Sequence, residues 1–240
     1  RAWLLAHDND ALPGAAHARL HELSTRRLAG EPMAYLTGSK AFYGLQLQVD
    51  ARVLDPRDDT ETLVDWALAL LPRDAGRRVL DLGTGSGAIA LALAAERPRA
   101  RVTAVDASAD ALAVAAGNAA RLGLELDLRH GDWFGPLADE RFDLIVSNPP
   151  YIAADDPHLP ALSHEPRQAL VSGADGLHDI RRIIAAAPEH LAPGAWLLLE
   201  HGWDQAAAAR ALLSDSGWAQ VQSRRDLAGV ERCPGGQWPL

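Results

Sequence analysis

From Thr60 to the C-terminus, short apolar segments alternate with longer segments of helical periodicity, and this alternation restricts the fold more than any other feature. Such a pattern is typical of a mostly parallel sheet whose two faces are both covered by helices. The sequence therefore predicts a doubly wound α/β domain. The expected strands are 78–82, 101–105, 126–130, 142–147 and 195–200, and the expected helices are 88–97, 109–122, 179–191 and 204–216.

The first 60 residues show two other patterns. Residues 1–30 carry leucines at helical spacing among polar residues, which predicts a helical segment. Between Ala41 and Val49, apolar and polar residues alternate around a glycine, as is typical of a β-hairpin. We therefore divide the chain into a helical segment (1–30), a hairpin linker (31–60) and the α/β domain (61–240).

Composition argues against several classes of protein. The chain has 23 Lys and Arg against 32 Asp and Glu, which disfavours a nucleic-acid partner because phosphates require a basic surface. No apolar run approaches the roughly 20 residues that a membrane span needs. The single cysteine, Cys233, rules out an internal disulfide and suits a reducing compartment, so we expect a cytoplasmic protein without membrane contact. The nine histidines show no metal-ligand spacing, and no metal is expected.

A glycine-rich turn, Gly83-Thr84-Gly85-Ser86-Gly87, joins the expected strand 78–82 to the helix that follows. Glycine lets a backbone turn sharply and approach a ligand closely. The next strand is followed by Asp106, whose carboxylate can accept hydrogen bonds from both ribose hydroxyls of an adenosine-type cofactor. The turn and the acid together therefore favour a nucleoside cofactor.

The glycine turn also fits the dinucleotide-binding pattern, so NAD is an alternative. Asp81, just ahead of the turn, argues for a different cofactor. A carboxylate there would repel a pyrophosphate, but it could pair, directly or through water, with the ammonium group of a methionine moiety. These residues alone do not choose the cofactor.

The tetrapeptide Asn148-Pro149-Pro150-Tyr151 directly follows strand 142–147, at the strand end where ligands bind in open α/β sheets. An amide nitrogen is a poor nucleophile because its lone pair is delocalised, so methylation requires acceptors that engage its hydrogens. The Asn148 side chain and the Pro149 carbonyl can supply two acceptors, the prolines stiffen the loop, and Tyr151 offers a flat face. The tetrapeptide therefore predicts methylation of a planar amide or amino nitrogen by S-adenosylmethionine, with Asn148 next to both cofactor and substrate.

Asp132 and Trp133 follow the expected strand 126–130. This position lies beside the strand that ends near Asp106, where an adenine ring would sit. Trp133 could cover the ring and Asp132 could bond its amino group, so both are candidate cofactor residues. A capped turn with an apolar anchor is the alternative.

Several motifs follow one another along the chain. They are Gly30-Glu-Pro-Met-Ala-Tyr-Leu-Thr-Gly38, Leu54-Asp-Pro-Arg-Asp-Asp-Thr-Glu61, the glycine turn, Asp132-Trp133-Phe134, Asn148-Pro-Pro-Tyr151 and Leu198-Leu-Glu-His-Gly202. Asn-Pro-Pro-Tyr is shared with adenine-N6 methyltransferases, whereas the combination with the two upstream motifs is much more specific. From about residue 20 to its end, the chain resembles the HemK/PrmC family, the glutamine N5-methyltransferases of peptide chain release factors.

The resemblance implies a class I, Rossmann-like methyltransferase fold with a seven-stranded, mostly parallel sheet. It implies that Gly83 to Gly87, Asp106 and Trp133 contact S-adenosylmethionine, which leaves as S-adenosylhomocysteine. It also implies that Asn148 to Tyr151 hold the glutamine amide of a Gly-Gly-Gln loop in the release factor. Family members carry a longer N-terminal helical domain, so residues 1–30 are interpreted as part of a substrate-docking domain.

Some details stay open at this stage. Ser163-His-Glu-Pro-Arg167 lacks the aromatic residue expected before Glu-Pro, which puts the shape of the substrate lid in question. Arg57 and Glu61 are candidates to brace the hairpin against the active site. Gly235-Gly236-Gln237 reproduces the presumed substrate tripeptide, and we interpret it as a chance sequence in a terminal strand, with self-methylation as the alternative. Adenine-N6 methylation of DNA or RNA and a non-catalytic scaffold are the competing functions.

Overall fold

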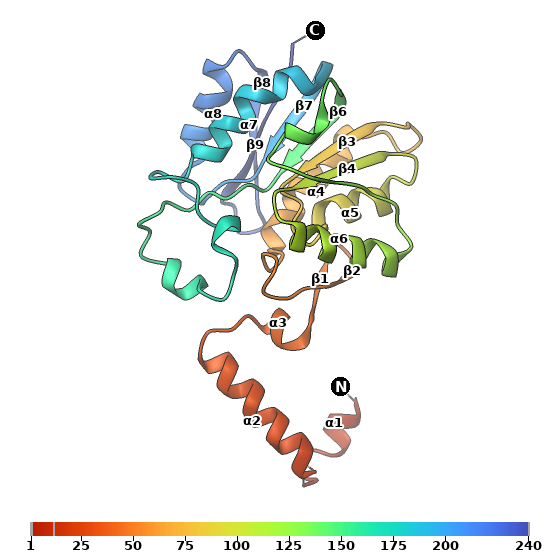
Figure 1. Ribbon diagram of the computed structural model, residues 1–240, viewed down its shortest axis with the longest axis vertical. Helices are drawn as coiled ribbons and strands as arrows, with labels where there is room; N and C mark the ends of the chain where they lie inside the picture. The colour runs from red at the N-terminus through yellow and green to blue at the C-terminus, as the bar shows by residue number, and fades with distance from the viewer. Residues whose placement is uncertain (1, 12, 240) are drawn as a thin grey trace.

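The computed structural model describes residues 2–11 and 13–239. These residues form a seven-stranded sheet in the order β5-β4-β3-β6-β7-β9-β8, together with a separate hairpin (Figure 1). Strand β9 is antiparallel to both neighbours and the other pairs are parallel, which confirms the expected fold class. The strands are β3 (Arg78–Leu82), β4 (Arg101–Asp106), β5 (Asp127–His130), β6 (Phe142–Ser147), β7 (Leu191–Leu199), β8 (Ala219–Arg225) and β9 (Glu231–Gln237).

Helices cover both faces of this sheet, and each face has its own apolar core. Successive strand residues point to opposite faces, so Val79 and Leu144 pack under α4, α5 and α6 while Leu80 and Ile145 pack under α7 and α8. The central strands are therefore mostly apolar on both faces, as a doubly covered sheet requires. The helices are α4 (Glu61–Leu70), α5 (Ala88–Glu96), α6 (Ala109–Leu122), α7 (His178–Ala186) and α8 (Ala206–Asp215).

The structure differs from the sequence-based boundaries most clearly in three places, one of which is strand β7, which begins at Leu191 rather than at residue 195. The expected helix 179–191 ends as an α-helix at Ala186 and continues as a 3-10 turn to His190. Pro188 explains this, because proline has no N–H for the α-helical ladder. Strand β8 was not among the expected strands, since its sequence AQVQSRR is largely polar and exposed at the sheet edge.

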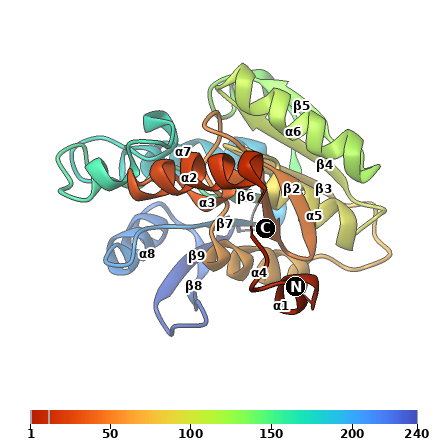
Figure 2. The ribbon, with the colours of Figure 1, turned by 90° about the horizontal axis from the view of Figure 1, so that it is seen from below.

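Helices α1 and α2 stand apart from the sheet in Figure 1, and the view from below shows α2 in front of the α/β domain (Figure 2). Helix α2 has no buried residue, and none of the described helices combines the length and apolarity that crossing a membrane demands. The helical segment predicted over 1–30 includes Arg1 and Leu12, which lie outside the described residues. The elements are α1 (Ala2–Ala6), α2 (Gly14–Leu28), α3 (Met33–Thr37), β1 (Ser39–Phe42) and β2 (Leu45–Gln48).

A buried side chain of α6 connects the β1–β2 hairpin to the glycine turn. Asn118 is fully buried; its Oδ1 accepts from the Gln48 N–H at 2.7 Å, and its Nδ2 donates to the Gln48 carbonyl at 3.0 Å. The same Nδ2 donates to the Ser86 carbonyl at 3.0 Å. The hairpin and the turn are therefore held in one fixed relation.

Replacement of Asn118 tests this connection. Asn118→Ala removes the three hydrogen bonds to Gln48 and Ser86 and a fourth from Arg121, and it leaves backbone groups of Gln48 and of the buried Ser86 without these partners, so the free energy of unfolding should fall by about 2–4 kcal/mol. Urea denaturation measures the change. Asn9→Ala, at an exposed residue, is the matched control and should shift stability by less than about 0.5 kcal/mol; equal effects of the two variants would contradict the assigned connection.

Candidate active site

The carboxyl ends of β3, β6 and β7 meet at Ser147. The Ser147 hydroxyl donates to the Leu82 carbonyl at 2.7 Å, and the Ser147 carbonyl accepts from the Glu200 N–H at 2.9 Å. Ligands of open α/β sheets bind outside these strand ends. The segment after β3 and the segment after β6 are therefore fixed side by side at the edge where binding is expected.

The glycine turn is tied to the next strand by its backbone. The N–H groups of Gly83 and Thr84 both donate to the Val105 carbonyl, at 2.9 and 3.0 Å. Gly83 has a φ of 71°, a region in which side chains are strained, and a Cβ at this residue would lie 3.4 Å from the Trp133 ring. Gly87 begins α5 at a φ of 82°. The turn is thus built for a close approach of the backbone to a ligand.

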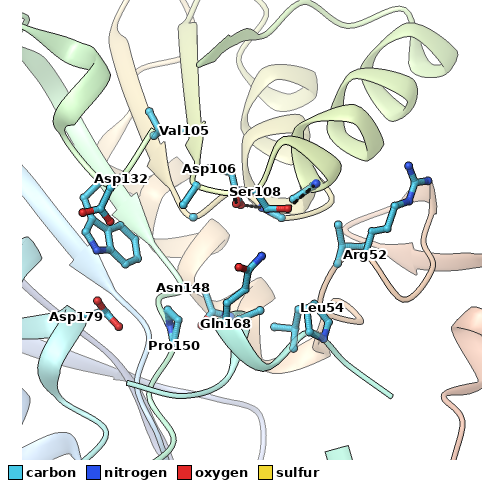
Figure 3. Close-up of a pocket in the computed structure, with 18 of the residues that line it drawn as sticks. Arg52, Leu54, Val105, Asp106, Ser108, Asp132, Asn148, Pro150, Gln168 and Asp179 are labelled. Carbon is cyan, nitrogen blue, oxygen red and sulfur yellow. Dashed lines mark hydrogen bonds between the residues drawn. The ribbon is translucent and has the colours of Figure 1, made fainter. Parts of the chain in front are cut away.

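Asp106, at the end of β4, faces this turn (Figure 3). Its Oδ2 accepts from the Gly85 N–H and its Oδ1 from the Ser108 N–H, both at 2.8 Å. Burial raises the pKa of this carboxyl, and the two N–H groups oppose that rise. Each carboxylate oxygen can accept more than one hydrogen bond, so Asp106 keeps acceptor capacity for a pair of hydroxyls.

A cavity of about 210 Å³ opens between Asp106 and the segment after β6, as Figure 3 shows. Its walls come from the glycine turn, the ends of β4 and β5, the Asn-Pro-Pro-Tyr segment and the loop that follows. Among the predicted cofactor residues, those that line it are Gly83, Gly85, Asp106, Asp132, Trp133 and Asn148. Lining residues that we did not predict include Leu54, Ser108, Gln168 and Asp179, and Pro150, predicted to hold the substrate, also lines this cavity.

Trp133 and Asp132 occupy one end of this cavity. Trp133 has a φ of 45°, a strained conformation for a bulky residue that is found mainly where function requires it. Asp132 forms an ion pair with Arg182. Its carboxylate is therefore held by a residue of helix α7. This pairing was not predicted.

Asp81 and the remaining residues of the glycine turn are buried, whereas most residues that line the 210 Å³ cavity are partly exposed. Asp81 is fully buried and its Oδ2 accepts from the Thr84 hydroxyl at 2.7 Å. It is absent from the linings of the described cavities, whereas Thr84 and Ser86 line a small one of about 50 Å³ beside Asn148. Its Oδ1 has no hydrogen-bond partner within the described residues, so the pairing of Asp81 with an ammonium group, directly or through water, stays a prediction.

Asn148 stands where three cavities meet. It lines the 210 Å³ cavity, the small cavity at the glycine turn, and a third of about 230 Å³ on the other side. Its Nδ2 donates to the Thr60 hydroxyl at 3.2 Å, which leaves the side-chain oxygen free for a ligand. Asn148 is thus in contact with both the 210 Å³ cavity and the 230 Å³ cavity.

The third cavity brings together Arg57, Tyr151 and apolar residues of the following loop. Burial raises the pKa of the Tyr151 phenol well above its usual value, so the ring is neutral at physiological pH. Pro150 lines the 210 Å³ cavity. Pro149 is buried and absent from the linings of the described cavities, so the predicted role of its carbonyl stays a prediction.

Residues 152–170, here called the lid segment, form a loop whose ends are paired: the Ile152 N–H donates to the Leu170 carbonyl at 2.8 Å. Glu165 of this segment forms an ion pair with Arg57 at 2.6 Å, with only 3% of its side chain exposed. Arg57 thus braces the lid rather than the hairpin. Glu61 does contact the hairpin, accepting from the Tyr43 N–H at 2.7 Å.

The remaining candidates lie away from these cavities. Gln237 pairs with Trp196 within β7, level with Leu144 of β6 and so below the strand end that carries Asn148, and its Nε2 donates to the Gly194 carbonyl at 2.7 Å. This position is incompatible with methylation of Gln237 within the same chain. In the ranges that the structure describes, no group of three or more His, Cys, Asp or Glu side chains could hold a metal ion.

Comparison with known proteins identifies the family. Residues 60–201 match the family Methyltransferase small domain and residues 1–38 the family PrmC N-terminal domain. Release factor glutamine methyltransferases of Bordetella pertussis and Xylella fastidiosa are 56% and 52% identical to the chain, each over 98% of it and 88% of the relative. The chain belongs to the release factor glutamine methyltransferase family.

A methyltransferase of Pyrococcus furiosus has the same fold, with a TM-score of 0.65 at 18% identity over 90% of this chain and 100% of that one. The methyl donor of the present protein, a member of the release factor glutamine methyltransferase family, is S-adenosylmethionine. The residues of its cavity fit this cofactor. Asp106 has free acceptor capacity for the ribose, Gly83 adopts a positive φ that lets the turn approach a ligand, and Asn148 lines the same cavity.

Titration of Asp81 should be visible in stability. Burial raises its pKa to about 7, whereas an unfolded Asp titrates near pH 4. Between these values the folded state binds the extra proton, so stability falls as pH rises. Asp81→Asn removes this dependence. The free energy of unfolding of the native protein, measured relative to that of the variant, should therefore fall as pH rises from about 4 to about 7. Above pH 7 the difference between the two proteins should stay constant. Urea titrations at several pH values test this; a constant difference throughout would contradict it.

Gly176 packs against the backbone of Tyr151. It has a φ of 73°, and a Cβ there would overlap the Tyr151 carbonyl oxygen, which also accepts from Gln205 Nε2 at 3.0 Å. Gly176→Ala should displace Tyr151 and lower methyl-transfer turnover by about tenfold or more. Gly217→Ala is the matched control, because Gly217 has a φ of 82° with no atom within 4 Å of the added Cβ. Equal losses of turnover would show that strain alone, and not contact with Tyr151, is responsible.

Proposed function

We propose that this protein transfers the methyl group of S-adenosylmethionine to the side-chain amide nitrogen, N5, of the glutamine in the Gly-Gly-Gln motif of peptide chain release factors. Its relatives carry the name release factor glutamine methyltransferase. The single observation that carries the proposal is the position of Asn148, which separates a cavity suited to the cofactor from one suited to the substrate. A group at this junction can touch both reactants.

The 230 Å³ cavity suits a glutamine side chain reaching in from a protein loop. Its lining is mostly apolar, with Leu54, Ile152 and Leu170 around the Tyr151 ring. Such walls pack against the methylene groups and exclude water, which strengthens the polar contacts at the amide end. The volume and lining support a small planar guest.

The residues of the chain act by positioning and polarisation. S-adenosylmethionine supplies an electrophilic methyl group on a sulfonium sulfur. The Asn148 oxygen accepts a hydrogen bond from the substrate NH₂, which orients the nitrogen lone pair toward the cofactor cavity and increases electron density on nitrogen. The Tyr151 ring packs against the amide plane. Holding two reactants in line in this way is worth on the order of 7–11 kcal/mol of the barrier. The methyl group passes from sulfur to nitrogen, S-adenosylhomocysteine leaves, and the nitrogen releases one proton to water after the transfer, so no side-chain base is required.

Charge favours a protein substrate over nucleic acid. The chain has a formal net charge of -9, and flipping a base out of a duplex requires contacts that neutralise phosphates. Adenine-N6 methylation is therefore not favoured. The proposal includes a cytoplasmic location, where release factors act, and docking of the release factor on the segment that contains α1 and α2.

Methyl transfer from labelled S-adenosylmethionine tests the proposal. The protein should label a release factor that contains Gly-Gly-Gln, and mass spectrometry should place the methyl group on that glutamine. A release factor with Glu in place of the motif glutamine is the matched substrate control and should stay unlabelled, as should duplex DNA. Labelling of DNA instead of the release factor would overturn the proposal.

Asn148→Ala tests the role of the central residue. Loss of a polar group that contacts the reacting atoms typically lowers turnover by about 100-fold or more, and we expect a fall of this size in kcat. Asn9→Ala, far from the cavities, serves as the control variant. Turnover of Asn148→Ala within about threefold of the native enzyme would refute this role.

A further inference from the structure

Glu200 is a buried carboxyl that the proposed chemistry does not use. It directly follows β7, only 1% of the residue is exposed, and its Oε2 has no hydrogen-bond partner within the described residues. Burying a carboxyl without full compensation is costly. A group of this kind at the edge of an active site is a candidate for a functional role.

The contacts of Glu200 lead to Asn148. The Thr60 and Asn148 side chains lie close enough to the Glu200 carboxyl for hydrogen bonding from both to lower its pKa, and Asn148 Nδ2 donates to the Thr60 hydroxyl at 3.2 Å. Thr60 is buried as well, with 4% exposed. The three side chains come from different parts of the chain and form one closed group beneath the cavities.

The chemistry of Glu200, Thr60 and Asn148 determines which group donates and which accepts in the hydrogen bonds among them. An ionised carboxylate can only accept hydrogen bonds, so the single hydroxyl hydrogen of Thr60 is donated to Glu200. The Thr60 oxygen is then left to accept, and the side of Asn148 that faces it must be the NH₂ group. The Asn148 oxygen consequently faces the cavities.

We propose that Glu200 is a positioning residue that, through Thr60, holds the Asn148 amide with its oxygen toward the substrate nitrogen. A flipped amide would present NH₂ to the substrate NH₂, a contact between two donors. The correct orientation is therefore required for polarisation of the nitrogen. The inference rests on the proposed function and adds the group that enforces its geometry.

The surroundings of Glu200 make this orientation sensitive to pH. Burial raises the pKa of the carboxyl to about 7, while the hydrogen bonds from Thr60 and Asn148 and the charge of Arg232 on β9 oppose the rise, and the negative charge of Asp59 adds to it. Tyr151 also faces this group and stays neutral. Protonation turns the carboxyl into a donor, which removes the reason for Asn148 to present NH₂.

The main experiment is the pH profile of kcat for methyl transfer. For the native enzyme, kcat should rise with pH through about 7 as Glu200 ionises. Glu200→Gln, which keeps the shape but can donate or accept, should lower kcat by roughly 10- to 100-fold and abolish this limb, with the dissociation constant for S-adenosylmethionine within about twofold. Glu140→Gln is the matched control. Glu140 lies just before the amino end of β6 and forms ion pairs with Arg78 and Arg129, so this variant should keep the kcat and the pH profile of the native enzyme.

Thr60 gives a second, independent pair of variants. Thr60→Val keeps the shape and removes the hydroxyl, so kcat should fall as in Glu200→Gln; Thr60→Ser restores the hydroxyl and should recover most of the loss. Equal kcat for the valine and serine variants, or a native profile for Glu200→Gln, would overturn the inference. Thr60→Val keeps the test valid if Glu200→Gln does not fold.

A spectroscopic readout separates this inference from the proposed substrate. The ¹⁵N side-chain amide signal of Asn148, assigned through its loss in Asn148→Asp, should shift as pH passes about 7 in the native protein and stay constant in Glu200→Gln. A shift that persists in Glu200→Gln would overturn the inference. This measurement requires no methyl acceptor, so failure to methylate a release factor would refute only the proposed function.

Discussion

The two hydrogen bonds of Ser147 hold together the carboxyl ends of the central strands, on which the site depends. Its hydroxyl reaches the Leu82 carbonyl and its carbonyl accepts from the Glu200 N–H, so the ends of β3, β6 and β7 are joined at one residue. All three partners are fully buried or nearly so, where hydrogen bonds are strong and unpaired groups are costly. The glycine turn, Asn148 and Glu200 each begin where one of these strands ends, and their mutual geometry follows from this junction.

The parts of the structure that the sequence predicted are those governed by local patterns. The apolar strands appear as β3 and β6 because a doubly covered sheet needs apolar residues on both faces. The glycine turn was visible because glycine is required where φ is positive, as at Gly83 and Gly87. Asp106 and Trp133 were found by their position after neighbouring strands, and both line the cavity beside the turn.

The parts that the sequence did not reveal depend on contacts between distant residues. Arg57 and Glu165 are separated by 108 positions, and nothing near either residue indicates the other. Glu200 stood in a motif without an assigned role, because its partners Thr60 and Asn148 become neighbours only when the sheet forms. Strand β8 was missed since an exposed edge strand lacks the apolar pattern by which buried strands are recognised.

The lid segment connects the two halves of the site. Gln168 and Ala169 line the cofactor cavity, while Ala169 and Leu170 line the opposite one, so a single loop closes both. In its ion pair with Arg57, the Glu165 side chain is only 3% exposed, and a carboxylate buried to this degree is costly to leave without its partner. Because Arg57 also lines the substrate cavity, a substrate that enters there meets the residue that holds the lid. The two cavities therefore share one loop, and the Arg57–Glu165 ion pair fixes the position of that loop beside both of them.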